Sequence, residues 1–309
     1  MEKFDSMKFK ALGKTGERIP AVGIGTWKLG TDRDTEMKAI RVGLELGMRM
    51  VDTAELYANE SLVGKAIEGE EGVLVATKVS PNHLHADDIE NSCNQSLKAL
   101  GVKTIDLYQI HWPNSKISVS ETMAAMEKLV KEGKIRYIGV SNFSVKELEE
   151  AQGALKSNEI VSNQVEYSVV VRDPERTMLD YARKNSITII AYSPLGAGAL
   201  FSKRLEGLYG ILDQIGKKHG KSPAQVALNW LVSKDMVVAI PKASNADHMR
   251  ENAGGVDFSL DRKEMLGIDS FRVKAAARTS TSRFHTLIKN TAPLWSDFMA
   301  DRYRKKLQK

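Results

Sequence analysis

Short apolar runs of strand length alternate along most of the chain with stretches in which apolar residues recur at helical spacing. Several runs are continuous Val, Ile and Leu sequences, as expected of parallel strands that are covered on both faces. Eight strands are therefore predicted. They span residues 19–27, 50–53, 73–79, 105–111, 135–140, 160–165, 187–192 and 236–241.

Helical signals fill the intervals between these strands. Met37, Ile40 and Leu44 fall on one face of a predicted helix. Ser222 and Pro223 have the residue types of a helix cap and a first helical turn. Eight strands that alternate with helices predict an α/β fold, a (β/α)8 TIM barrel. A doubly wound open sheet is the alternative.

Two segments lie outside this repeat. Residues 7–18 predict a hairpin whose turn is formed by residues 13–16, and residues 272–309 follow the last unit as a basic C-terminal extension. No Pro, Gly or Ser-rich linker separates two large cores. We therefore predict one domain over residues 1–309, with the barrel at about 19–271.

Composition narrows the class of protein. Hydrophobic residues make up 42% and charged residues 27% of the 309 positions, which is typical of a folded, water-soluble chain. No apolar run approaches the ~20 residues of a membrane-spanning helix, and the first residues lack the apolar core of a secretory signal. The one cysteine, Cys93, is expected to face the core and cannot form an internal disulfide. We expect a cytoplasmic protein with no membrane partner.

The positive charge is concentrated at one end of the chain. From residue 272 onward Lys and Arg exceed Asp and Glu by eight, so the remainder of the +6 chain is slightly acidic. A basic tail could contact nucleic acid, but a solvated lysine-rich helix is the favoured interpretation. We predict no nucleic-acid partner, and a monomer or weak homo-oligomer.

Ionisable side chains follow the predicted strands where a barrel enzyme places its chemistry, at the carboxyl ends. Asp52, Lys78 and His111 end three strands, and Tyr57 follows the first of them. Tyrosine titrates near ~10, and a nearby ammonium group lowers that pKa. Tyr57 would donate a proton to a carbonyl oxygen, Lys78 would lower its pKa, Asp52 would hold Lys78, and His111 would orient the carbonyl. The hydride must then come from a cofactor, because no side chain supplies one.

The segments around these residues resemble those of the aldo-keto reductases, in the same order over about residues 7 to 271. The resemblance implies a barrel that binds NADP(H) in an extended pose without a Rossmann domain. It also implies reduction of aldehyde or ketone carbonyls, including sugar-derived ones, and the reverse oxidation of alcohols. The matching segments are VGIGTW (22–27), VDTAELY (51–57), ATK (76–78), YQIHWP (108–113), GKIRYIGVSNF (133–143), NQVEYS (163–168), AYSPLG (191–196) and IPKASNADHMREN (240–252).

Site residues follow from this resemblance position by position. The catalytic tetrad falls on Asp52, Tyr57, Lys78 and His111. The aromatic walls of the substrate pocket fall on Trp27 and Trp112. The alternative for Trp27 is that it is a packing residue. The cofactor set, which also includes Asp52, runs from the nicotinamide to the adenine. The carboxamide contacts are Ser141, Asn142 and Gln164, the stacking aromatic is Tyr192, and the pyrophosphate loop has Ser193 and Leu195. The 2′-phosphate segment has Lys242, Ser244, Asn245 and His248, the adenine contacts are Glu251 and Asn252, and Gly25 and Thr26 complete the set.

The resemblance is weakest around the 2′-phosphate. The family usually has serine after the lysine and arginine six residues past it, whereas this chain has Ala243 and His248. A neutral histidine offers one hydrogen-bond donor, whereas the arginine guanidinium can bind a phosphate with two parallel hydrogen bonds. We therefore expect NADP(H) to be preferred and NAD(H) to be a second cofactor. His248 is either a phosphate ligand or a solvated helix residue.

Other designs fit the sequence less well. No G-x-G-x-x-G joins a strand to a helix, and the six histidines are dispersed, so no metal site is predicted. The alternative function is a nucleotide-binding regulatory or structural subunit on the same barrel, with little turnover.

Overall fold

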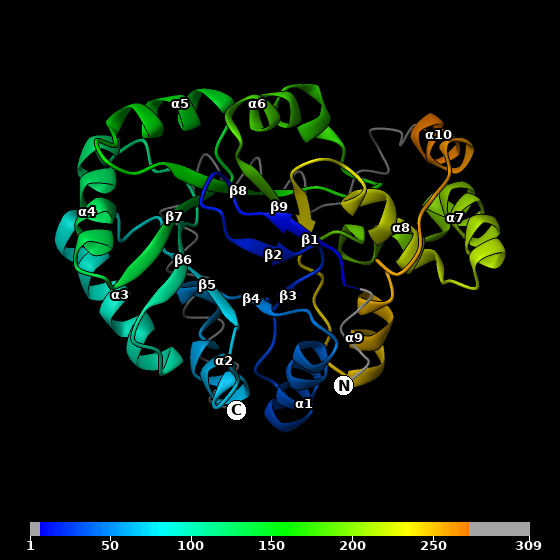
Figure 1. Cartoon of the computed structure of the whole chain (residues 1–309), viewed down its shortest axis with the longest axis horizontal. Helices are drawn as coiled ribbons and strands as arrows, with labels where there is room; N and C mark the ends of the chain where they lie inside the picture. Colours follow the sequence, from blue (N-terminus) through cyan, green and yellow to red (C-terminus); the bar gives the residue numbers. More distant parts are fainter. Residues whose placement is uncertain (1–6, 272–309) are drawn as a thin grey trace.

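The computed structural model describes residues 7–271, and eight parallel strands form its central sheet (Figure 1). The strands pair in chain order from β3 to β10. Parallel bridges join Val22 to Ala239 and Gly25 to Lys242, and these close the sheet on itself. The strands are β3 (Ile24–Gly25), β4 (Met50–Asp52), β5 (Leu74–Val79), β6 (Ile105–Ile110), β7 (Ile135–Ser141), β8 (Ile160–Glu166), β9 (Thr188–Tyr192) and β10 (Val237–Ala239). The barrel prediction is therefore confirmed and the open sheet is excluded.

Helices surround this sheet, as Figure 1 shows. The helices are α1 (Arg33–Glu45), α2 (Glu60–Ile67), α3 (Ala86–Leu100), α4 (Val119–Lys131), α5 (Val145–Ala154), α6 (Met178–Asn185), α7 (Glu206–His219), α8 (Pro223–Val232), α9 (Ala246–Ala253) and α10 (Arg262–Ser270). Short 3-10 turns are η1 (Glu55–Tyr57), η2 (Asp173–Arg176), η3 (Gly196–Phe201) and η4 (Lys203–Leu205). The cap predicted at Ser222 is present, because its hydroxyl accepts a hydrogen bond from the Gln225 amide and Pro223 stands in the first turn of α8.

The prediction of a single strand over residues 19–27 is wrong. Arg18–Pro20 forms β2 and pairs antiparallel with β1 (Phe9–Ala11), whereas Ile24–Gly25 forms the barrel strand β3. The segment changes partners between these points: the Ala21 amide donates to Lys8, and the Gly23 amide donates to Ala239 on β10. One apolar run thus contributes residues to two sheets, and the periodicity of the sequence alone does not show where one strand ends and the next begins.

The hairpin β1–β2 covers the amino-terminal end of the barrel and crosses the middle of the ring in Figure 1. Its Leu12 and Ile19 pack in one buried cluster with Met50, Leu74 and Leu107 from the strands. At the turn, Gly13 has φ +56°, and a Cβ atom there would lie 2.9 Å from the Cβ atom of Val161. Glycine is therefore required both by its backbone conformation and by the close approach to β8.

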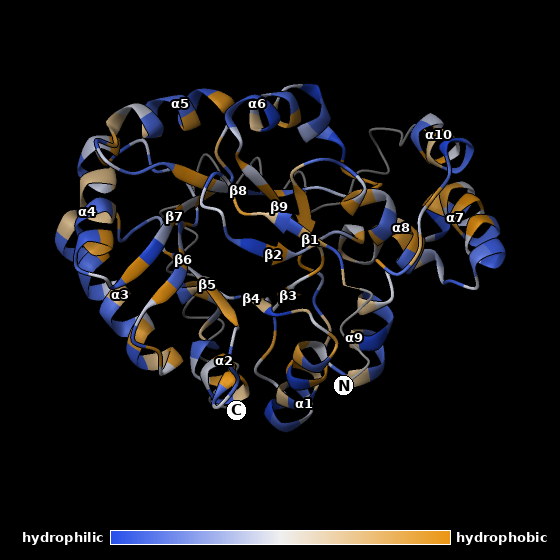
Figure 2. Cartoon of the chain, in the orientation of Figure 1, coloured by the Kyte–Doolittle hydropathy of each residue, from blue (hydrophilic) through white to orange (hydrophobic). Residues whose placement is uncertain are grey.

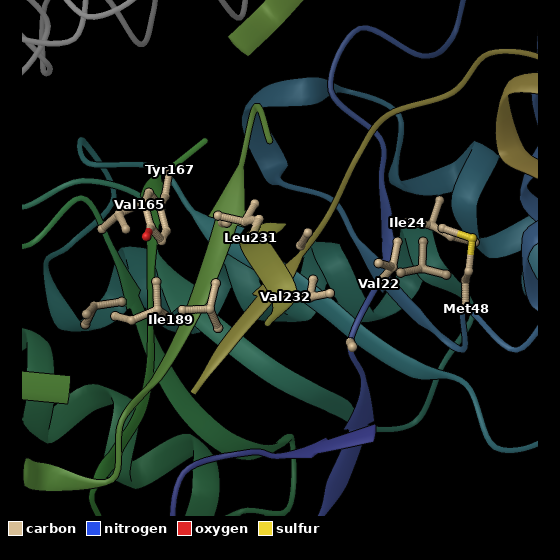
Figure 3. Packing of buried hydrophobic residues seen from close by; sticks show 14 of the residues in the cluster. Val22, Ile24, Met48, Val165, Tyr167, Ile189, Leu231 and Val232 are labelled. Atoms are coloured by element: carbon tan, nitrogen blue, oxygen red, sulfur yellow. The ribbon is translucent and has the colours of Figure 1, made fainter. Parts of the chain in front are cut away.

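A second and larger apolar cluster fills the layer between the strands and the helices. Figure 3 shows part of it, with Val22, Ile24 and Met48 on one side and Leu231 of α8 on the other. Figure 2 shows hydrophobic and hydrophilic residues mixed in both the helices and the strands. Every residue of β5 and β8 is nevertheless buried, as expected when both faces of the sheet are covered. Among residues 7–271, no helix is both long and apolar enough to cross a membrane. The single-domain prediction stays a prediction, since its extension at 272–309 lies outside the described residues.

Cys93 provides a test of this packing. Its side chain on α3 is fully buried, and burial raises the pKa of the thiol to about 12. Thiolate is the reactive form of cysteine. We therefore expect the native protein to leave its single cysteine unmodified by a thiol reagent at neutral pH, and the denatured protein to titrate one thiol per chain. Fast labelling of the native protein would show that α3 does not pack as described.

Candidate active site

The alternation of side chains along the strands brings a polar group into the barrel. In β5, Leu74 and Ala76 belong to the inner cluster beside the hairpin, whereas Val75 and Val79 belong to the outer one. Because successive side chains of a strand point to opposite faces, Lys78 points inward. The inward-facing positions of the strands are thus apolar at the amino-terminal end of the barrel and polar at the carboxyl end.

Asp52 at the end of β4 is the acceptor at the centre of this group. One carboxylate oxygen lies 2.5 Å from the Lys78 ammonium, and the other accepts hydrogen bonds from the side-chain amides of Gln164 at 2.8 Å and Gln109 at 3.1 Å. The backbone carbonyl of Asp52 accepts from the Thr26 hydroxyl at 3.0 Å. Asp52 therefore connects residues from β5, β6 and β8 with the segment after β3.

The Lys78 ammonium is completely enclosed, with its side chain 0% exposed and that of Asp52 2% exposed. It also donates to the Thr53 carbonyl at 2.8 Å. Burial lowers the pKa of Lys78, and the Asp52 charge opposes that shift. The pair satisfies the rule that a buried charge requires a partner and hydrogen bonds.

Tyr57 lies beside this ammonium. It ends η1, and the Lys78 ammonium lies 5.0 Å from the centre of its ring. The His111 ring meets it edge to face, with 5.6 Å between centroids and an interplanar angle of 80°. The structure therefore brings together the four residues that the sequence predicted to converge.

The expected lowering of the Tyr57 pKa by Lys78 is not what the structure shows. Burial raises the pKa of Tyr57 well above 10, and the Asp52 carboxylate raises it further. The physical reason is that burial removes the water that would solvate a phenolate, and this loss outweighs the attraction of an ammonium whose charge Asp52 offsets at 2.5 Å. Tyr57 is thus a phenol that holds its proton.

A polar cluster continues along the ends of β7, β8 and β9. The Ser141 hydroxyl donates to the Gln164 carbonyl at 2.9 Å, and the Asn142 amide nitrogen donates to the His111 carbonyl at 3.1 Å. Tyr192 donates from its hydroxyl to the Asn142 side-chain oxygen at 2.8 Å. Asn142 has φ +64°, a left-handed conformation in which asparagine is favoured over most residues. These predicted residues lie together, with the Gln164 amide group directed at Asp52.

The segment predicted for the 2′-phosphate surrounds the start of α9. Asn245 caps this helix by accepting from the His248 amide at 2.9 Å, and the exposed His248 ring lies 3.4 Å from Glu251. Partial burial lowers the pKa of Lys242, Glu36 opposes that shift, and Lys28 adds to it. The Lys242 ammonium, four residues before α9 begins, and the Lys28 ammonium that acts on it provide positive charge suited to an anion.

The remaining predicted residues divide between the rim and the interior. Trp27 is half-buried, with the Lys28 ammonium 4.2 Å from its ring centre, and its assignment as a pocket wall stays a prediction. Ala243 and Asn252 are buried, so the methyl group of Ala243 lies in the core and not at the surface. Glu251 accepts from the Ser222 hydroxyl at 2.6 Å. The other members are buried or half-buried at the same end of the barrel: Gly25, Thr26, Trp112, Ser193, Leu195 and Ser244.

Comparison with known proteins identifies the class to which this arrangement belongs. A sequence model described as the aldo/keto reductase family matches residues 21–273. The chain belongs to the aldo/keto reductase family. It is 39% identical over 259 residues to the methylglyoxal reductase YeaE of Escherichia coli strain K12, which covers 81% of this chain and 90% of that relative.

Solved structures of aldo-keto reductases agree. A thermostable member in complex with the inhibitor epalrestat has 42% identity and a TM-score of 0.80, and the match covers 85% of this chain and 99% of that one. An aldo-keto reductase from Klebsiella pneumoniae in complex with NADPH has 34% identity and a TM-score of 0.79, with 88% and 98% covered. The barrel and the enzyme class of this aldo/keto reductase are therefore established.

Sequence reasoning missed three residues of the site. Gln109 is fully buried and bonds Asp52, and its signal was its position two before His111, which places both on the same strand face. Asn59 donates to the Thr26 carbonyl at 2.7 Å and accepts from Thr53 at 2.7 Å, which joins the segments after β3 and β4. No sequence pattern pointed to Lys28, because its place in the site depends on its electrostatic interaction with Lys242, which is distant in the chain.

Breaking the buried ion pair is expected to cost more than removing it. Asp52→Asn leaves an uncompensated ammonium, so the free energy of unfolding should fall by about 3–5 kcal/mol. Asp52→Asn combined with Lys78→Met should recover much of that loss, because neither side chain of the pair is then charged. Urea unfolding measures both. The exposed pair Lys146–Glu150 on α5 is the control, and its disruption should change stability by less than about 1 kcal/mol.

Proposed function

We propose that this enzyme reduces small aldehydes and ketones with NADPH, with Tyr57 as the general acid and Asp52, Lys78 and His111 completing the catalytic set. The observation that carries the proposal is the fully buried Lys78–Asp52 pair, with Tyr57 and His111 beside it at the carboxyl end of the barrel. Membership in the aldo/keto reductase family supports the reaction class.

Each of the four residues has a distinct task. NADPH, when bound, supplies the hydride that reaches the carbonyl carbon. Tyr57 gives its hydroxyl proton to the carbonyl oxygen as negative charge develops there, and its raised pKa keeps that proton in place beforehand. Lys78 beside the ring stabilises the phenolate that remains, Asp52 keeps Lys78 charged, and His111 orients the carbonyl. Reversal of these transfers oxidises an alcohol.

The residues present fit a phosphorylated dinucleotide. The positive region at Lys242 and Lys28, next to the α9 amino terminus, suits the 2′-phosphate. Ser244, Asn245 and His248 would add hydrogen bonds there, with Glu251, Asn252, Gly25 and Thr26 nearby. At the other end Ser141, Asn142, Gln164 and Tyr192 would hold the nicotinamide, and Ser193 with Leu195 would line the pyrophosphate.

A small dicarbonyl is the proposed substrate class. The relative with 39% identity is named a methylglyoxal reductase, which supports this choice. Trp27 and Trp112 would form the apolar walls that cover such a molecule. Turnover of methylglyoxal exceeding that of bulky aromatic ketones would support the assignment, and the opposite order would refute it.

The organisation of the chain completes the proposal. A single domain over residues 1–309 is supported by the family match across 21–273. We also propose a cytoplasmic enzyme, monomeric or weakly associated, and the buried free thiol of Cys93 fits a reducing compartment.

Replacing the proposed acid provides the main test. Tyr57→Phe removes only the hydroxyl and should lower kcat roughly 10²–10⁴-fold, since general acid catalysis contributes about that much. NADPH binding, followed by protein fluorescence, should stay within about twofold. Tyr137→Phe changes a phenol beside the hairpin, at the far end of the barrel, and serves as control. A Tyr57→Phe enzyme with parental turnover would refute the mechanism.

Cofactor choice can be tested separately. Lys242→Met removes one charge from the proposed phosphate site and should weaken NADPH binding about tenfold, the equivalent of a charge-assisted hydrogen bond. NADH lacks the 2′-phosphate, so its affinity should change little. Lys146→Met on α5 should affect neither nucleotide. If the affinities for NADPH and NADH fell equally, Lys242 would lie outside the phosphate site.

A further inference from the structure

Glu55, two residues before Tyr57, joins the turn that carries the tyrosine to the segment that follows β5. One carboxylate oxygen accepts the backbone N–H of Ser80 at 3.0 Å, and the other lies 2.5 Å from Nδ1 of His83. Ser80 is two residues past Lys78. The carboxylate thus bridges the two chain segments whose spacing sets the distance between Tyr57 and Lys78.

Within residues 7–271, no other side chain of this turn makes a hydrogen bond. The turn is a single 3-10 turn without a side-chain cap, and it ends at Ala58 in a left-handed conformation. Both flanks of the turn are fixed by hydrogen bonds. The Thr53 carbonyl accepts one from the Lys78 ammonium, and the Asn59 side chain donates one to the Thr26 carbonyl in the segment after β3. Among residues 7–271 the Tyr57 hydroxyl itself makes no hydrogen bond to another residue. Between the flanks, Glu55 makes the polar contact that crosses to the segment after β5.

We propose that Glu55 is a positioning residue that holds Tyr57 at its working distance from Lys78 and the carbonyl by accepting the Ser80 N–H. His83 keeps the carboxylate in the rotamer that reaches Ser80. The inference rests on the proposed function of Tyr57. It adds that placement of the acid depends on a side chain at the rim, since Glu55 is 22% and His83 43% exposed.

The chemistry of the contact sets the expected effect. A carboxylate accepting a backbone N–H is a charge-assisted hydrogen bond, which is shorter and stronger than a neutral one. Displacement of a reacting group by about 1 Å can cost ~10²-fold in rate. Glu55→Ala should therefore lower the rate of hydride transfer by roughly 10–100-fold. NADPH affinity should be unchanged, because Glu55 lies outside the proposed nucleotide contacts.

A conservative variant separates positioning from charge. Glu55→Gln keeps an oxygen that can accept the Ser80 N–H, so it should restore the rate to within about fivefold of the parent. His83→Ala removes the support of the carboxylate and leaves the Ser80 contact possible, so its loss should be smaller than that of Glu55→Ala.

The chain supplies a matched control in Glu121 on α4. Its carboxylate accepts the Ala86 N–H at 3.1 Å and lies 3.1 Å from Nδ1 of His85, at the far end of the same loop. Glu121→Ala removes the same kinds of contact without touching the turn that carries Tyr57. Its rate of hydride transfer should equal that of the parent.

The experiment is a single-turnover measurement of NADPH consumption with methylglyoxal, with nucleotide affinity and thermal unfolding recorded for every variant. A slow Glu55→Ala enzyme with parental NADPH affinity, rescued by Gln, supports the inference. Equal rates for Glu55→Ala and Glu121→Ala overturn it, as does a Gln variant as slow as Ala. If Glu55→Ala does not fold, the rates of Glu55→Gln and His83→Ala decide in the same way. A parent protein without NADPH binding would instead refute the proposed function.

Discussion

The buried ion pair between Lys78 and Asp52 is the constraint around which the carboxyl end of the barrel is built. An ammonium that is 0% exposed is tolerable only with an opposite charge at 2.5 Å and a carbonyl at 2.8 Å. The remaining lone pairs of Asp52 require donors as well, and Gln109 and Gln164 supply them. Polar groups from β4, β5, β6 and β8 are therefore fixed relative to one another by the need to satisfy one buried charge.

The same requirement shapes the chemistry. Because burial disfavours the phenolate and the Asp52 carboxylate adds to that effect, the phenol of Tyr57 keeps a high pKa, and its proton leaves only when a strong base develops beside it. A carbonyl oxygen that gains negative charge is such a base. A fixed ammonium 5.0 Å from the ring then meets the new charge without reorganisation, which is the general source of electrostatic catalysis in a closed site.

The two ends of the barrel do different work. At the amino-terminal end the hairpin packs Leu12 and Ile19 against the strands and closes the interior with apolar contacts. At the carboxyl-terminal end the same rows of inward side chains become polar. The interior is thus apolar beneath the ion pair and polar above it, and this keeps the charge interactions strong where a substrate would react.

The sequence by itself determined the order of strands and helices and which residues stand at the strand ends, and it predicted a barrel with an open sheet as the alternative. The bridges that close the sheet appear only in the tertiary structure. The sequence also placed Asp52, Tyr57, Lys78 and His111 in one candidate site. Only the tertiary structure decided that residues 18–20 pair with β1 and that Gln109 bonds Asp52. It also decided that burial raises the pKa of Tyr57. These features depend on residues that are distant in the chain and on the water that is removed when those residues pack together. Local periodicity carries no information about either.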